Sequence, residues 1–465
     1  MRGQKAEIMR ESSDPFVKAI FTAITAASMF GAGTLHAAEI SIDIKAERWE
    51  LKPGLVTTAW TYNGQVPGTP IVVRKGETLV VRAVNRLAVT TNIHWHGLEV
   101  PNDQDGPSIE IPPGGSFRYE FVPKESGTYF YHTHARPVLP QLDRGLYGSF
   151  IVTASEDAGY SGDHTLMLDD WYLDANGRRL EGTARGDMER YGNVETVNGK
   201  TGSAIEPLVF RTGELHKLRF INASTAAVHT LKITGHTFRV THTDGHPLSA
   251  PYVTDRIILS PAERIDAEVS ATGGTGGEWT IASDRPESGI RIPILYAAGA
   301  RERVPSPFVP PPSRAFPGID AKQPDAALVL NSEMNMGGGM SMGHSMNMEG
   351  GPSGMMRWTI NGESFPYAEP IFVKTGEVVK LRLRNADTQM MHTMDHPIHI
   401  HGTFFQVVSL NGRAPERETW KDTITVPAGQ YVDVAFIMKN PGQWMLHCHI
   451  IDHEDGGMMT MIEAR

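Results

Sequence analysis

The chain has 465 residues, a formal net charge of −10 at pH 7 and one cysteine, Cys448. A modestly acidic protein is not expected to bind nucleic acid, and a single cysteine excludes disulfide bonds within the chain. The length favours about three domains.

Residues 1–38 differ in composition from the rest of the chain. Lys18 precedes an apolar stretch over residues 19–35, which ends in Leu35-His36-Ala37-Ala38. This pattern is typical of a secretory signal peptide with a small-residue cleavage site, and the stretch is too short to span a membrane. No other apolar run approaches its length. We therefore expect a periplasmic or secreted mature chain without a membrane span, and the absence of a twin-arginine pair leaves the export route open.

Three blocks with the same internal spacing follow one another along the chain. Each contains an Asn-Gly pair and then a Gly-Glu pair, with an arginine six residues and an asparagine nine residues after the second glycine. Neighbouring runs alternate apolar and polar residues, as strands do, and such repetition indicates one structural unit per block. We predict an all-β protein with sandwich domains at residues 39–155, 156–300 and 357–465. The Gly-Glu pairs begin at Gly76, Gly213 and Gly376.

Two His-X-His motifs lie in the first predicted domain. They are His94-Trp95-His96-Gly97 and His132-Thr133-His134. Side chains two residues apart on a strand share one face, so each motif presents two imidazoles side by side. One such pair alone is usually just two surface histidines. Whether the pair binds a metal therefore depends on the motifs in the other domains.

The second predicted domain has lost these residues. The positions that correspond to the two motifs read Lys232-Ile233-Thr234-Gly235 and Ala282-Ser283-Asp284. We therefore predict no metal ligand in residues 156–300. Its other histidines lack the same surroundings, and we interpret them as ordinary surface or core residues; they include His229, His236, His242 and His246.

Residues 301–356 are predicted to connect the second and third domains. Residues 301–317 are rich in proline, which is typical of an extended linker. Residues 334–356 combine methionine with Gly, Ser and Asn and include His344. A plain flexible linker is one interpretation, but thioethers are soft ligands that favour Cu(I), and we predict copper capture. The methionines are Met334, Met336, Met340, Met342, Met346, Met348, Met355 and Met356.

The third predicted domain holds the cysteine. It contains His396-Pro397-Ile398-His399-Ile400-His401-Gly402 and His447-Cys448-His449, followed by His453 and Met458. On a strand Cys448 faces away from both neighbouring histidines. His396 has the opposite parity to His399 and His401, so it can lie beside Cys448.

Parity sorts these residues into two groups. One thiolate, two imidazoles and a thioether form the ligand set of a blue electron-transfer copper. A structural zinc site needs only four ligands and usually several cysteines, so zinc does not account for the pattern. The first group is His396, Cys448, His453 and Met458. The second is His94, His96, His132, His134, His399, His401, His447 and His449, enough imidazoles for three further coppers.

The four segments resemble, in order, the four copper-binding signatures of the multicopper oxidases, the superfamily of laccases and cuprous oxidases. The resemblance implies three cupredoxin-like Greek-key sandwiches and four coppers per chain. It implies a type 1 copper held by His396, Cys448 and His453 with Met458 axial, and a type 2 copper held by His94 and His399. A type 3 pair would be held by His96, His132, His134, His401, His447 and His449.

Two acidic residues match family positions near the three-copper cluster. Asp105 follows the first motif, and Glu454 follows His453 directly. Reduction of O2 to two waters needs four protons, so carboxylates there would act as proton donors. The alternative is that both are solvated charges.

The resemblance leaves the reductant open. The methionine-rich segment and Trp420-Lys421-Asp422 look closest to periplasmic cuprous oxidases, which points to Cu(I) oxidation in copper tolerance. A laccase that oxidises phenols or aromatic amines would share every copper ligand. A copper-sequestering resistance protein is an alternative of another class. The expected partners are O2 and the reductant, and the expected state is a monomer.

Overall fold

The computed structural model describes residues 38–154, 157, 159–182, 189–285, 287–300, 307–334, 356–388 and 394–465. The predicted signal peptide lies outside these residues. The fold is nearly all β, with 52% strand and 4% helix, and the strands form six sheets. The predicted all-β class is therefore confirmed. Within the described part of the chain, no helix is long and apolar enough to cross a membrane.

The first sandwich consists of two four-stranded sheets, ordered β2-β1-β4-β6 and β3-β8-β7-β5. Its inner faces bury apolar side chains such as Leu79, Trp95 and Tyr131, because alternate residues of each strand point inward. The strands are β1 (Ala38–Lys52), β2 (Leu55–Tyr62), β3 (Gly68–Arg74), β4 (Leu79–Asn85), β5 (His94–His96), β6 (Ser116–Phe121), β7 (Gly127–His132) and β8 (Tyr147–Thr153), with the short helix α1 (Leu139–Leu142) before β8.

The second sandwich has a six-stranded and a five-stranded sheet, ordered β10-β9-β12-β17-β14-β15 and β11-β19-β18-β13-β16. Phe220, Phe238 and Ile281 lie in the core between them. The strands are β9 (Gly162–Trp171), β10 (Val194–Val197), β11 (Leu208–Thr212), β12 (Leu215–Asn222), β13 (His229–Ile233), β14 (Phe238–Thr243), β15 (His246–Thr254), β16 (Arg256–Leu259), β17 (Arg264–Ser270), β18 (Trp279–Ser283) and β19 (Arg291–Ala300).

The third sandwich pairs sheets ordered β21-β20-β23-β28-β25-β26 and β22-β30-β29-β24-β27. Trp358, Ile398 and Trp444 lie in its core, together with Cys448. The elements are β20 (Ala326–Met334), β21 (Met356–Ile360), β22 (Ile371–Val373), β23 (Val378–Asn385), β24 (His396–Ile400), β25 (Phe405–Leu410), β26 (Trp420–Lys421), β27 (Thr423–Val426), β28 (Tyr431–Ile437), β29 (Gly442–Cys448), α2 (Ile451–Asp455) and β30 (Met459–Ala464).

Strand β20 corrects the predicted connector at residues 301–356. It pairs with β23 and with β21, and its Leu328 and Leu330 are buried in the third core. The methionine-rich segment therefore joins two paired strands of the third sandwich instead of linking the second and third domains. Residues 335–355 lie outside the described residues. Met334 pairs with Met356 at the base of this connection, and Met356 is a core residue.

The repeated asparagine has the same structural task in each sandwich. The side-chain amide of Asn85 donates to the carbonyl oxygens of Val89 and Ile111, 2.7 and 2.8 Å away. Asn222 and Asn385 bond two carbonyl oxygens each in the same manner. The repeat thus encodes a buried amide that satisfies loop carbonyls where a core strand ends.

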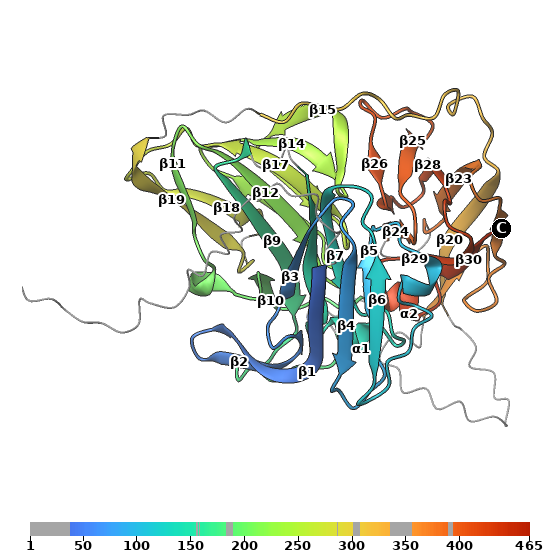
Figure 1. Ribbon diagram of the computed structural model, residues 1–465, viewed down its shortest axis with the longest axis horizontal. Helices are drawn as coiled ribbons and strands as arrows, with labels where there is room; N and C mark the ends of the chain where they lie inside the picture. Colours follow the sequence, from blue (N-terminus) through green and yellow to red (C-terminus); the bar gives the residue numbers. More distant parts are fainter. Residues whose placement is uncertain are drawn as a thin grey trace, which may run out of the picture. The chain divides into compact units, whose positions relative to one another are not determined.

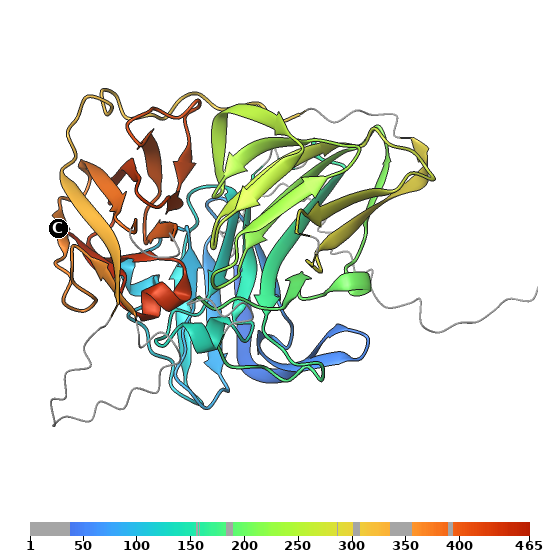
Figure 2. The same cartoon turned by 180° about the vertical axis from the view of Figure 1, so that it is seen from behind.

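The first and third sandwiches bring their histidine-bearing strands together. Strands β5 and β7 of the first lie beside β24 and β29 of the third in both views of the fold (Figures 1 and 2). The end of strand β14 of the second sandwich reaches the same region, since Thr243 donates to the carbonyl oxygen of Trp420 at 3.2 Å. All three sandwiches therefore contribute to the surroundings of the candidate site.

Candidate metal centre

Cys448, His396 and His453 converge at one point inside the third sandwich. The Cys448 Sγ lies 3.5 Å from Nδ1 of His453 and 3.8 Å from Nδ1 of His396, and the two nitrogens are 3.2 Å apart. Cys448 pairs with Ile398 across β24 and β29, so His396, two residues earlier on β24, shares its face. These three residues form one group of possible metal ligands.

Met458 is fixed beside the same three residues by its backbone. Its N–H donates to the carbonyl oxygen of His453 at 2.8 Å, and its own carbonyl accepts from the Cys448 N–H at 3.1 Å. Its side chain belongs to the buried cluster that contains Cys448. The next methionine, Met459, is also buried but is not part of that cluster. A thioether ligand at this site would therefore come from Met458.

Carboxylates lie behind both histidines of this site. Nε2 of His396 is 2.7 Å from Oδ2 of Asp387, and Nε2 of His453 is 3.6 Å from Oε1 of Glu189. Trp358 stacks on His453, with ring centroids 3.6 Å apart and planes inclined by 22°. Burial raises the pKa of Asp387, but the hydrogen bond with His396 outweighs it and holds the pKa below its usual range. Both rings are thus oriented with Nδ1 toward the cysteine.

Neither Asp387 nor Glu189 was predicted from the sequence as a site residue. Asp387 stands two residues after the repeated Asn385, where the other repeats have Leu87 and Ser224, so an acid at that position was a usable signal. Glu189 comes from the second sandwich. Its neighbour Arg190 anchors it, because the Arg190 N–H donates to Asp452 at 2.6 Å and its guanidinium to Asp143 at 2.9 Å. No local sequence pattern reveals that contact.

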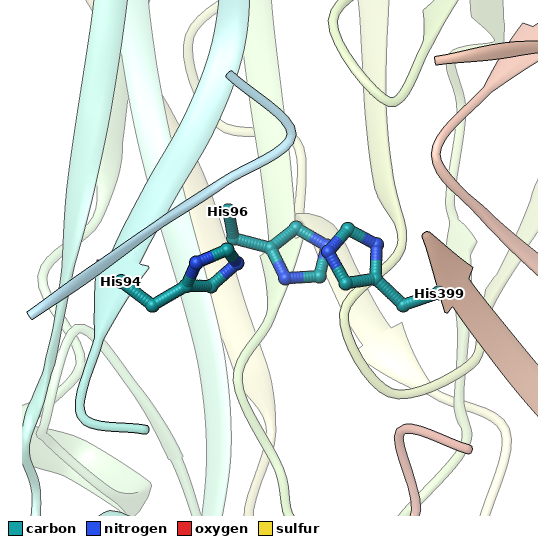
Figure 3. Close-up of side chains that lie close together, drawn as sticks. All are labelled: His94, His96 and His399. Atoms are coloured by element: carbon teal, nitrogen blue, oxygen red, sulfur yellow. The ribbon is translucent and has the colours of Figure 1, made fainter. Parts of the chain in front are cut away.

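The eight histidines of the second predicted group lie together between the first and third sandwiches. Their ring nitrogens form three sets of possible ligands: His94, His96 and His399; His96, His132 and His449; and His134, His401 and His447. Figure 3 shows the first set, with two rings from the first sandwich meeting one from the third. Cross-strand pairing supports this arrangement, since His94 faces His132 and His399 faces His447.

Most of these rings present Nε2 to the shared space. Their Nδ1 atoms lie 2.8 to 3.0 Å from oxygen atoms of the surrounding chain, which fixes the proton on Nδ1. Within the described residues, the buried Nε2 atoms of His94, His132 and His399 have no hydrogen-bond partner. Buried lone pairs that accept no hydrogen bond are suited to bind a metal cation. The rings held through Nδ1 are His94, His132, His399, His401 and His447.

His96 is turned the other way. Its Nε2 lies 3.1 Å from both Oδ1 of Asp422 and Oγ1 of Thr423, and its Nδ1 is buried without a hydrogen-bond partner among the described residues. The lone pair of this ring is therefore on Nδ1. Asp422 was predicted from the sequence only as part of the Trp420-Lys421-Asp422 resemblance, without a contact to the histidines.

Burial controls the protonation of the donors. Desolvation lowers the pKa of His399 and of His453 to about 4, so both rings are neutral at pH 7 and can bind a metal ion. Burial also raises the pKa of the Cys448 thiol well above its usual range. A bound cation would have to displace that proton to obtain a thiolate ligand.

Asp105 and Glu454 lie against the histidine cluster. Oδ2 of Asp105 is 2.8 Å from Nδ1 of His401, and Oε2 of Glu454 is 3.2 Å from Nδ1 of His447. Both carboxylates are buried, with 3% and 1% of the residue exposed. The alternative that they are solvated charges is therefore wrong.

The second sandwich supplies no histidine or cysteine to the grouped donors found among the described residues. His229, His236, His242 and His246 are buried, so they are core residues and not surface ones. For example, His236 contacts the hydroxyl of Tyr296 at 2.7 Å.

Comparisons with known proteins agree with this geometry. Three family models, each described as multicopper oxidase, match residues 43–157, 162–295 and 339–465. The chain is 29% identical to the multicopper oxidase MmcO of Mycobacterium tuberculosis, over 88% of this chain and 84% of that protein. The matched ranges contain every residue of the two predicted donor groups, the one with Cys448 and the one with eight histidines.

Two solved structures are similar over almost the whole chain. A multicopper oxidase from Pseudomonas thermotolerans has a TM-score of 0.77 and 28% identity, covering 93% of this chain and 100% of that one. A multicopper oxidase from Campylobacter jejuni, described as a metallo-oxidase, has a TM-score of 0.74 and 28% identity, covering 92% and 91%. The second sandwich, which lacks grouped donors, is matched as well.

Proposed function

Because this chain belongs to the multicopper oxidases, we propose that it couples four one-electron oxidations of Cu(I) to the reduction of O2 to two waters. Membership makes it a copper-dependent oxidoreductase with O2 as acceptor. The observation that carries the proposal is the covalent link between two donor groups. Cys448 lies in one group, and its neighbours His447 and His449 lie in the other.

We assign four coppers to these donors. His396, Cys448 and His453, with the thioether of Met458 as a further ligand, would hold a type 1 copper. His94 and His399 are assigned to a type 2 copper, and the type 3 pair is assigned to His96, His132, His134, His401, His447 and His449. Copper, when bound, supplies the one-electron redox chemistry and the site of O2 reduction.

Residues of the chain connect the two copper sites and include carboxylates that can transfer protons. The backbone from Cys448 to each neighbouring histidine is the shortest covalent path between the two sites. Asp105 and Glu454 contact histidines of the cluster and are our candidates for proton donors to reduced oxygen.

The position of the methionine-rich segment supports Cu(I) as the reductant. Its two ends continue from β20 and β21, and both strands reach the type 1 site. Ser332 of β20 donates to Asp387 from its N–H and its hydroxyl, each at 2.7 Å, and Asp387 contacts His396. Trp358 of β21 stacks on His453. Thioethers of the methionine-rich segment would collect Cu(I) for the site that contains His396 and His453.

We further propose a periplasmic or secreted enzyme that acts in copper tolerance as a monomer. The apolar segment with its small-residue end supports export. The similarity to a metallo-oxidase from Campylobacter jejuni supports a metal ion, and not an organic molecule, as the reductant.

The test is O2 consumption by copper-loaded protein with Cu(I) and, separately, with 2,6-dimethoxyphenol. Two variants are compared: deletion of residues 335–355 with a short Gly-Ser closure, and a full-length variant with Met336, Met340, Met342, Met346 and Met348 changed to Ser. Both should lose most of the Cu(I) activity, while phenol oxidation is retained because it does not need the thioethers.

Other results would redirect the proposal. Phenol rates that exceed Cu(I) rates in the unaltered protein would identify a laccase. Copper binding without O2 consumption would identify a sequestering protein. An equal loss of both activities only in the deletion variant would give the segment a folding role.

A further inference from the structure

Asp422 is a buried carboxylate that contacts histidines of two sandwiches. It lies between β26 and β27 of the third sandwich and is 0% exposed. Its Oδ1 accepts from Nε2 of His96, of the first sandwich, at 3.1 Å. Its backbone carbonyl accepts from Nδ1 of His399 at 2.9 Å. One residue therefore orients two neighbouring rings of the cluster.

Arg264, at the start of β17 in the second sandwich, binds this carboxylate with both terminal nitrogens. Nη1 donates to Oδ1 at 2.7 Å, and Nη2 donates to Oδ2 at 2.5 Å. This paired arrangement is specific to the planar guanidinium, since a lysine ammonium cannot reproduce it. Asp422 is therefore held in one orientation by a residue of the sandwich that has no grouped metal donors of its own.

Every N–H of the Arg264 guanidinium has an acceptor. Besides the two bonds to Asp422, the group donates to the carbonyl oxygens of Thr128, Ala262 and Asp244, each at 3.1 Å. A guanidinium has five N–H donors, and all five are hydrogen-bonded. The group therefore cannot rotate without breaking a hydrogen bond. Thr128 belongs to the first sandwich, Asp422 to the third, and the others to the second. The group thus has a fixed position where all three meet.

The sequence leaves room for this ion pair. Gly97, directly after His96, has a φ of +84°, and a Cβ there would overlap the Asp422 carboxylate and the Arg264 guanidinium. The glycine of the first His-X-His-Gly motif therefore clears the space through which the pair reaches His96. In the third sandwich, a Cβ on Gly402 would instead meet the Trp444 ring. The same motif glycine thus serves different neighbours in the two sandwiches.

The contacts of the pair fix the direction of its hydrogen bonds. Both oxygens of the Asp422 carboxylate accept from the Arg264 guanidinium, which has donors and no acceptor. Asp422 is therefore the acceptor in its contact with His96 as well. The proton of His96 must therefore stay on Nε2, which leaves the Nδ1 lone pair for the space shared with His132 and His449.

Stability alone does not explain a pair of this kind. Burying two charges costs about as much as their attraction returns, and apolar replacements are often as stable. For comparison, Arg219 is a buried, ion-paired arginine of the same sandwich that lies away from the histidine cluster. It is equally buried and donates to Asp163 at 2.6 Å and to Thr128 at 2.9 Å, yet the structure gives it no contact with a grouped histidine.

We propose that Arg264 and Asp422 are positioning residues of the three-copper cluster, which fix His96 as a ligand through Nδ1. The second sandwich, without ligands of its own, would thereby set the geometry of one type 3 copper. This inference rests on the proposed assignment of His96 to the type 3 pair.

The test compares purified, copper-loaded Arg264→Met and Asp422→Asn with the unaltered protein. Loss of an outer hydrogen-bond partner lowers metal affinity about 10- to 100-fold. We expect that loss for the type 3 coppers, measured by competition with a chelator. The fraction of copper visible by electron paramagnetic resonance should rise as the spin-coupled pair is lost, while the blue absorption of the Cys448 site is retained.

Matched variants separate positioning from folding. Arg219→Met removes a buried arginine of the same sandwich and should lower thermal stability without changing the resonance spectrum. Arg264→Lys should keep the charge but still show the altered spectrum, because it lacks the paired donors. If Arg264→Met fails to fold, Asp422→Asn, which keeps the size of the side chain, decides the question.

Two results would overturn the inference. One is a normal resonance spectrum and copper affinity in Asp422→Asn. The other is the same spectral change in Arg219→Met. If the unaltered protein itself contains no spin-coupled copper pair, the assignment of the cluster fails before the role of Arg264 is reached.

Discussion

Asp105 and Asp422 occupy matching places on opposite sides of the histidine cluster. Each sandwich has a His-X-His pair, His94 and His96 in the first and His399 and His401 in the third. The backbone carbonyl of each acid accepts from the first histidine of the pair in its own sandwich, at 2.9 Å. The side chain of each reaches across to the second histidine of the other motif. Asp105 contacts His401 at 2.8 Å, and Asp422 contacts His96 at 3.1 Å. Two sandwiches that share the same sequence repeat thus exchange carboxylates across their interface.

The two acids differ in their other partners. Asp422 is held by both terminal nitrogens of Arg264. Asp105 has only the rings of His94 and His401 within ion-pair distance among the described residues. Both oxygens of Asp422 are engaged by the guanidinium, whereas Oδ1 of Asp105 has no hydrogen-bond partner among the described residues. We therefore expect Asp422 to hold the cluster in place and Asp105 to exchange protons with it.

The roles of Asp105 and Asp422 matter only if electrons reach the histidine cluster through Cys448, so this assignment is tested first. Cys448→Ser should remove the intense blue absorption and leave no measurable O2 consumption, because serine is a poor substitute for the thiolate ligand. The eight cluster histidines should still bind copper, which metal analysis checks. A serine variant that remains blue or continues to turn over would contradict the assignment of both sites.

The two acids can then be compared directly. Asp105→Asn and Glu454→Gln should slow reoxidation of the reduced enzyme by O2 about 10²- to 10⁴-fold, the usual contribution of a positioned acid or base, with copper content unchanged. Stopped-flow absorbance measures this rate. Asp422→Asn should instead lose copper from the cluster. The expected difference between the acids would be refuted if all three variants reoxidise at the original rate, or if Asp105→Asn loses copper as Asp422→Asn does.

A smaller effect is expected at the blue site, where neither acid acts. Met458→Leu should keep the blue absorption but raise the reduction potential, because loss of the weak axial donor destabilises oxidised copper. Met459→Leu is the matched control and should leave the potential unchanged. Redox titration of both variants distinguishes them, and a shift only in Met459→Leu would mean that the wrong methionine was assigned.

The smallest effect concerns His242, which limits the pH range over which the acids can be compared. Burial, followed by nearby Lys217, lowers the pKa of His242 to about 3. The unfolded chain takes up a proton below about pH 6.5 while the folded chain does not, so stability falls as pH decreases from about 6.5 toward 3. The loss should reach roughly 3 kcal/mol at pH 4.

His242→Gln should flatten this acid-induced loss and leave the oxidase rate at pH 7 unchanged. Denaturant unfolding at pH 7 and pH 4.5 provides the measurement. An unchanged pH dependence in the variant would show that another group, and not His242, destabilises the fold in acid.

The sequence predicted the donors better than what surrounds them. The two-residue repeat of a strand is enough to separate Cys448 from His447 and His449, and the structure brings together the same groups that parity formed. Strand β20 was missed because its short apolar run stands next to a methionine- and glycine-rich segment that dominates the local composition. Asp387 could have been found from the repeat, because it occupies the position at which the other two repeats have Leu87 and Ser224.

Arg264 and Glu189 could not have been found in the same way. Both belong to the second sandwich, and both act on histidines far away in sequence. Their roles follow from the packing of whole sandwiches against one another, such as the bonds of Arg190 to Asp143 and Asp452. Periodicity within a strand carries no information on such contacts.

The depth of the histidine cluster has a consequence for how copper enters and leaves. None of its eight rings is more than 2% exposed, and the rings come from two sandwiches that close over them. We therefore expect an incoming ion to bind only when the two sandwiches separate locally. The exchange rate of isotopically labelled copper should then report the frequency of that opening and be nearly independent of chelator concentration. Metallation would be a slow step controlled by protein motion, and the finished enzyme would retain its metal through brief copper starvation.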